Sequence, residues 1–114
     1  MREFEVLEMI YDDYKTFLIV SKKFNATCRV SIFYNEPDEA IITDLYVKDD
    51  VRRNNIGTRL LKFSILLSHQ QQCKYIELKS KEDNWIRDWY RKIGFELISA
   101  DGWMRKNINN ERIF

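Results

Sequence analysis

The sequence predicts an α+β domain in which a mixed, mostly antiparallel sheet of six to seven strands is flanked by two main helices. Apolar and polar residues alternate through the first 48 positions, which is the period of half-buried strands. From Ile56 the apolar spacing becomes that of a helix, and a strand, a second helix and a hairpin follow. A chain of 114 residues can bury a core of its own, so one domain, 1–114, is expected.

Four strands are predicted in the first half of the chain. They are expected at 3–10, 15–22, 27–35 and 39–48, separated by the turn-like segments "YDDY", "KFNA" and "NEPDE". Because these breaks are short, consecutive strands are expected to pair as an antiparallel meander.

The second half is predicted to fold as helix, strand, helix and hairpin. The first helix begins at Ile56 and ends near "SHQQQ", and "KYIELKS" at 74–80 is a fifth strand. Asp83 or Asn84 caps a second helix, and Gly94 stands where a helix end favours a left-handed residue. The apolar stripe of this helix consists of Trp85, Ile86, Trp89, Tyr90 and Ile93. "FELIS" and "WMRKNI" form the closing hairpin, with Asp101-Gly102 as its turn.

Composition narrows the class of protein. With 45% apolar and 14% aromatic residues, the chain is typical of a globular domain. Its two cysteines do not form a disulfide framework, and no Cys/His cluster has the spacing of a metal site. The N-terminal "MREFEVLEMI" lacks the core of a signal peptide, and the longest apolar run, "FLIV", is too short to span a bilayer. A cytoplasmic location, no membrane association and no metal are therefore expected.

Charge is divided unequally along the chain. Residues 1–50 hold 6 Lys/Arg and 11 Asp/Glu, whereas residues 51–114 hold 13 and 7. Such a division indicates two partners of opposite sign, or an anion bound by the second half, although the two halves could also simply attract each other. The basic residues are scattered among acids rather than clustered, so nucleic-acid binding is not expected.

The stretch "VRRNNIGTRLL", residues 51–61, opens the first helix with Arg52, Arg53 and Gly57. The first N–H groups of a helix lack intrahelical partners and carry partial positive charge, so nearby arginines are unfavourable unless an anion binds. A phosphate is the usual anion, and a small residue lets it approach the main chain. The arginines could instead be a solvated face beside a permissive turn residue, and this stretch alone leaves both interpretations open.

Two motifs in the right order carry a resemblance to a known family. "ITDLYVKDDVRRNNIGTRLL" resembles the acyl-coenzyme A signature of the GNAT acetyltransferase superfamily, and "DNWIRDWYRKIGFELI" resembles that family's second helix and following strand. The resemblance covers residues 40–108. It implies the GNAT-type sheet and transfer of an acetyl group from acetyl-CoA to a primary amine by direct attack.

The resemblance also implies where the coenzyme binds. The strand before the signature would pair with the pantetheine arm through its main chain. Arg52 falls on the first position of the motif, and the main-chain N–H groups from about Arg53 to Thr58 would hold the pyrophosphate. The residues expected to bind the coenzyme are Leu45, Tyr46, Val47, Arg52, Arg53, Asn54, Asn55, Ile56, Gly57, Thr58 and Asn84. Asn55 departs from the family pattern, which has Gly there. Because Asn tolerates positive φ better than other non-glycine residues, the turn can be kept at some strain. The departure therefore bears on the affinity for the coenzyme more than on the assignment to the family.

The resemblance assigns two catalytic candidates. Tyr90 matches the tyrosine that protonates the departing thiolate, although its position on an apolar helix face also suits a core aromatic. Arg87, three residues earlier, could favour the phenolate or could pair with an acid on the surface. Asp44 is the nearest acid on the fourth strand and could deprotonate the amine through water, or be an ordinary exposed carboxylate. The oxyanion donor is expected to be a main-chain N–H near Tyr46 or Val47.

One feature of the family is missing. GNAT proteins usually carry one or two helices between their first two strands, which wall the acceptor side, but here only "YDDY" joins these strands. The site could admit a cationic peptide, a protein amine or a polyamine, or a second subunit in a homodimer could complete it. A catalytically weak domain that binds acyl-CoA as an interaction module is the alternative function.

Overall fold

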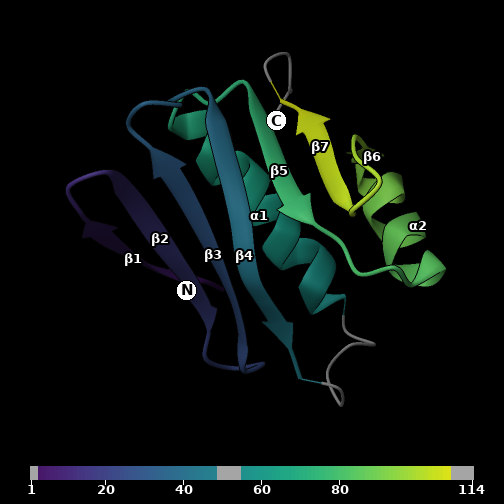
Figure 1. The fold of residues 1–114 in the computed structure, drawn as a ribbon. Coiled ribbons are helices and arrows are strands. Elements are labelled where there is room, and N and C mark those ends of the chain that lie inside the picture. The colour runs from purple at the N-terminus through teal and green to yellow at the C-terminus, as the bar shows by residue number, and fades with distance from the viewer. Residues whose placement is uncertain (1–2, 49–54, 109–114) are drawn as a thin grey trace.

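The computed structural model describes residues 3–48 and 55–108, which form a seven-stranded sheet with two helices behind it (Figure 1). The strands are β1 (Glu5–Ile10), β2 (Tyr14–Ser21), β3 (Ala26–Phe33), β4 (Glu39–Val47), β5 (Tyr75–Lys79), β6 (Glu96–Leu97) and β7 (Trp103–Asn107). The helices are α1 (Ile56–Gln70) and α2 (Asn84–Ile93). The predicted fold class and element order are confirmed, and the five strands before α2 begin and end within two residues of their predicted bounds.

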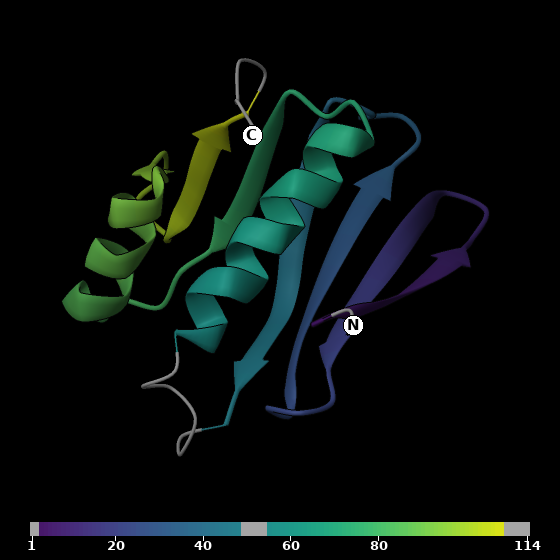
Figure 2. The same cartoon turned by 180° about the vertical axis from the view of Figure 1, so that it is seen from behind.

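The strands lie in the order β1-β2-β3-β4-β5-β7-β6. All neighbours are antiparallel except β4 and β5, which run parallel because α1 crosses over between them. Figure 2 shows α1 lying diagonally across the back of the central strands, with α2 beside β7. The predicted meander of β1 to β4 is thereby confirmed.

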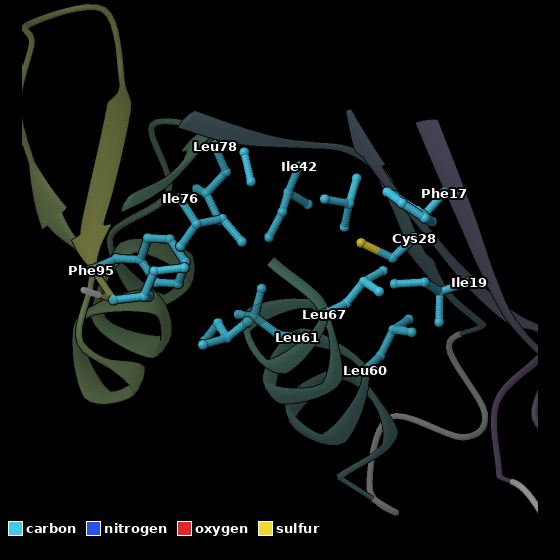
Figure 3. Packing of buried hydrophobic residues seen from close by; sticks show 14 of the residues in the cluster. Phe17, Ile19, Cys28, Ile42, Leu60, Leu61, Leu67, Ile76, Leu78 and Phe95 are labelled. Atoms are coloured by element: carbon cyan, nitrogen blue, oxygen red, sulfur yellow. The ribbon is translucent and has the colours of Figure 1, made fainter. Parts of the chain in front are cut away.

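The core lies between the sheet and the helices. Phe17, Ile19 and Cys28 point from β2 and β3 towards α1, and Leu60 and Leu61 pack from the helix side (Figure 3). Phe95 packs against the same face of the sheet beside α2. Because strand side chains alternate between faces, this pattern leaves the opposite face of the sheet without a helix among the described residues. That face is called the open face below.

A bulge in β4 shapes the site. The register between β3 and β4 shifts between Thr27 and Arg29, and Asp44 adopts a left-handed conformation with φ 54°. The parallel pairing of β4 with β5 extends to Ile42 opposite Leu78, although β4 itself continues to Val47. The carboxyl ends of the two strands are therefore not hydrogen-bonded to each other.

Two other features bear on the predictions. The Tyr11 N–H donates to the Tyr14 carbonyl at 2.8 Å, so β1 and β2 are joined by a tight turn with no helix between them, as predicted. The closing hairpin differs from its prediction: Ile98 pairs with Trp103 around a four-residue loop, 99–102, and not around Asp101-Gly102 alone. No helix in residues 3–48 or 55–108 is long and apolar enough to cross a membrane.

Candidate active site

A cavity of about 600 Å³ opens where β4 and β5 separate, beside the start of α1 and one face of α2. Its walls come from four elements far apart in the sequence. Of the predicted site residues it brings together Asp44, Leu45, Val47, Asn55, Gly57, Thr58 and Tyr90. Sequence reasoning did not assign Thr43, Lys79, Lys81, Trp85, Ile86 and Trp89 to the site, although they also line it.

The cavity reaches both faces of the sheet. Ile42 and Leu78 belong to the core between the sheet and the helices. Thr43 and Lys79 follow them directly in the chain, so their side chains point towards the open face. Two reactants could therefore enter from opposite faces and meet between the strands.

The start of α1 leaves donors available for an anion. Asn55 is the N-cap with φ 57° and ψ 23°, in the left-handed region, as its residue type predicts. Its side chain makes no capping hydrogen bond, and the first turn of α1 contains no acidic residue. The helix dipole, and first-turn N–H groups that the Asn55 side chain does not cap, therefore make this end of the cavity suitable for a phosphate.

Gly57 lies where three elements meet. A β-carbon at this position would stand 3.4 Å from Cζ2 of Trp89 and 3.5 Å from Cγ2 of Val47. These are ordinary contact distances, so a β-carbon would fit between α2 and β4, and the packing itself does not require glycine here.

Tyr90 is the buried residue of α2. Its ring packs against Trp89 at 4.9 Å and Phe95 at 5.9 Å between centroids, and the side chain lines the cavity. Burial, with a smaller contribution from Cys28, raises the pKa of Tyr90 to about 12. The phenol is therefore protonated at neutral pH and available as a proton donor.

Arg87 contacts the segment between β5 and α2. Its Nε donates to Ser80 Oγ at 3.2 Å and to the Lys81 carbonyl at 3.1 Å. These hydrogen bonds hold the segment in place. Burial and Cys28 are the causes of the raised pKa of Tyr90, so the influence of Arg87 on the phenolate stays a prediction.

Residues 12–97 match the family model described as "Acetyltransferase (GNAT) domain". The chain belongs to the GNAT acetyltransferase family. This match covers most of the 114 residues and confirms the resemblance seen in the two motifs.

Solved GNAT structures share the fold. The chain is similar to a GNAT-family acetyltransferase from Staphylococcus aureus Mu50, with a TM-score of 0.68 and 17% identity over 83% of this chain and 68% of that one. Nourseothricin acetyltransferase is similar with a TM-score of 0.65 and 16% identity over 91% of this chain and 82% of its own. PaiA N-acetyltransferase from Thermoplasma acidophilum was solved in complex with coenzyme A. It is similar with a TM-score of 0.65 and 18% identity over 83% of this chain and 61% of its own. No curated protein showed significant sequence similarity to the chain.

Not every predicted residue lies at the cavity of this GNAT domain. Tyr46 is 52% exposed and does not line the cavity, and Asn84 is exposed at the start of α2. Ile56 is fully buried, so only its main chain is available to a ligand. Arg52, Arg53 and Asn54 lie outside the described residues.

The residues that are present suit an acyl-CoA cosubstrate. The uncapped start of α1 can receive the diphosphate, and Lys79 and Lys81 add positive charge to the cavity wall. Leu45 and Val47 supply an apolar strand surface for a pantetheine arm. Within residues 3–48 and 55–108, no group of His, Cys, Asp and Glu is placed to hold a metal ion.

Proposed function

We propose that this protein is an N-acetyltransferase that transfers the acetyl group of acetyl-CoA to a primary amine. The observation that carries the proposal is the juxtaposition, in one cavity, of an uncapped helix start and a buried, protonated tyrosine. An anion site and a proton donor are the two features that the donor half of this reaction requires.

The donor enters from the helix side. Main-chain N–H groups from Asn55 to Thr58 bind the diphosphate. The end of β4 from Leu45 to Val47, which pairs with β3 but not with β5, lies beside the pantetheine arm. The amine attacks the thioester carbonyl, a main-chain N–H near Tyr46 or Val47 stabilises the oxyanion, and the carbon–sulfur bond breaks to release the thiolate.

Tyr90 donates to the departing thiolate. With a phenol pKa of about 12 and a thiol near 8.5, complete proton transfer in the ground state is uphill by about 5 kcal/mol. Desolvation raises the pKa of any thiol held in the same cavity, which narrows this difference. We therefore assign Tyr90 as a hydrogen-bond donor that becomes the general acid as the bond to sulfur breaks.

The acceptor enters from the open face, where the tight β1–β2 turn leaves the site without the usual covering helices. Asp44 lines the cavity there and can take a proton from the incoming ammonium through water. The acidic first half of the chain favours a cationic acceptor, such as a lysine-rich peptide, a protein amine or a polyamine.

The second candidate function is a catalytically weak module that binds acyl-CoA. Two observations favour it: Asn55 replaces the glycine of the family pattern, and helices that would wall an acceptor site are missing between β1 and β2. Such a module would bind the coenzyme without turnover.

One experiment separates the two candidates. Thiol release from acetyl-CoA is measured with a panel of cationic and neutral amines at low and high salt, alongside the rise in Tm caused by coenzyme A. We expect turnover, with a preference for cationic amines that shrinks as salt screens the exposed acids. Stabilisation by coenzyme A without turnover on any amine would favour the binding module, and the absence of both would exclude each candidate.

A further inference from the structure

A hydrogen bond connects the two helices that border the cavity. The Trp89 Nε1–H of α2 donates to Thr58 Oγ1 of α1 at 3.0 Å, across 31 positions of sequence. Both residues are half-buried and line the cavity. Thr58 is the third residue of α1, in the first turn, which the Asn55 side chain does not cap.

The chemistry of the two groups determines the direction of this bond. An indole N–H can only donate, so the Thr58 hydroxyl must accept, and its own proton is left for another acceptor. A hydroxyl whose lone pair is already engaged loses rotational freedom, so that its O–H is limited to the remaining directions. At the first turn of α1, a phosphate oxygen is an acceptor that this O–H could meet.

The indole ring also contacts the same turn. It stands over Gly57, where a β-carbon would be 3.4 Å from Cζ2, and its centroid lies 4.9 Å from the ring of Tyr90. Trp89 therefore touches the start of α1 on one side and the proton donor on the other. A shift of Trp89 would therefore change the packing at both the start of α1 and Tyr90.

We propose that Trp89 is a positioning residue, which orients the Thr58 hydroxyl so that it donates a hydrogen bond to the diphosphate of the coenzyme. This inference rests on the proposed function, because it presupposes an acyl-CoA ligand. It adds a side-chain donor to the main-chain N–H groups and makes coenzyme affinity depend on a residue of the opposite helix.

The test is a double-mutant cycle read as the Kd of coenzyme A by calorimetry. Thr58→Val keeps the shape and removes the hydroxyl, and we expect it to weaken binding roughly tenfold, the scale of a lost hydrogen bond to a charged group. Trp89→Phe keeps an aromatic ring over Gly57 and removes the N–H, and should weaken binding about threefold to tenfold. Both changes break the same chain of hydrogen bonds, from Trp89 through Thr58 to the diphosphate. The double variant should therefore bind coenzyme A no more than about twofold weaker than Thr58→Val alone.

Two controls separate positioning from folding. Thr58→Ser retains the hydroxyl and should keep most of the affinity, and the ligand-free Tm of Trp89→Phe should stay close to that of the wild type. Trp103→Phe makes the same chemical change on β7, outside the cavity, and should leave the Kd unchanged.

This inference would be overturned if Trp89→Phe bound coenzyme A with wild-type affinity. It would also be overturned if the losses in binding free energy of the two single variants added fully in the double variant. Either result would leave the proposed function intact. A loss in Trp89→Phe matched by a large fall in its ligand-free Tm would also overturn it, in favour of a structural role. A wild-type protein that fails to bind coenzyme A would overturn the proposed function itself.

Discussion

Arg29 Nε of β3 lies 3.4 Å from Asp44 Oδ2 of β4, across the bulge where the register of the two strands shifts. Asp44 has positive φ there, and its side chain is 74% exposed. A non-glycine residue held in this conformation within a strand costs of order 1 kcal/mol or more, and such strain gathers at functional sites. The ion pair holds the carboxylate beside the opening of the cavity to the open face.

Asp44→Asn tests whether this carboxylate accepts the proton of the amine. We expect kcat/KM for the amine to fall about a hundredfold, the usual scale for loss of a general base, with coenzyme affinity unchanged. Stability should change little, because exposed ion pairs contribute roughly 0–1 kcal/mol. Arg29→Gln is the matched control, since it breaks the same pair but leaves the carboxylate. Equal rates in both variants and the wild type would limit Asp44 to a role in the bulge.

Asn55 provides a test of the coenzyme turn. Because its φ is 57°, Asn55→Gly should relieve strain and keep or raise the affinity for coenzyme A, measured by calorimetry. Asn55→Val should lower it, since a β-branched residue resists the left-handed conformation. If Asn55→Val bound coenzyme A more tightly than Asn55→Gly, the left-handed conformation at residue 55 would not be what shapes the coenzyme site.

The carboxyl groups of Glu39 and Glu77 on the open face predict a pH-dependent stability. A hydrogen bond from Glu39 to Glu77, together with burial and the charge of Glu77, raises the pKa of Glu39 to about 7. Burial raises the pKa of Glu77 too, but its hydrogen bonds with Glu39 and Arg105 outweigh this and leave it below the ordinary value. Arg105 binds Glu77 at 2.8 Å, and the charge of Glu36 also acts on Glu39.

Because the pKa of Glu39 is higher in the folded state, folding takes up a proton between about pH 4.5 and 7, and stability from this group falls as pH rises through that window. Glu39→Gln stays neutral and can still donate to Glu77. From pH 5 to 8, urea unfolding should show the wild type losing about 1 kcal/mol relative to this variant, a figure kept low because solvent screens the half-exposed carboxyl. If the free energies of unfolding of the wild type and Glu39→Gln changed in parallel from pH 5 to 8, the proton shared between Glu39 and Glu77 would be contradicted.

The strands and helices could be predicted because their signals are local. Alternation placed β5 at 74–80 against an observed Tyr75–Lys79. The left-handed Asn55 was indicated by the resemblance to the family pattern, which has Gly at that position, together with the tolerance of Asn for positive φ. The bulge at Asp44 has no such signal, because it is defined by pairing with β3, and an Asp in an alternating strand looks like any exposed residue.

Contacts between distant elements also escaped prediction. Trp85 shares the apolar stripe of α2 but is 63% exposed, because helical spacing defines a face and not how far the neighbouring elements extend over it. In the hairpin, Ser99 Oγ accepts the Trp103 N–H, so the turn begins earlier than Asp101-Gly102 indicates. The hydrogen bond between Trp89 and Thr58 arises only when α1 and α2 meet.

The most direct test of the proposed activity is the rate of acetyl transfer by Tyr90→Phe. The variant lacks only a hydroxyl, so the packing against Trp89 and Phe95 and the affinity for coenzyme A should stay close to the wild type. With the best amine from the panel, thiol release under saturating acetyl-CoA should fall about a hundredfold, because the departing thiolate loses its proton donor. An unchanged rate on that amine would contradict the account and leave Tyr90 as a core aromatic.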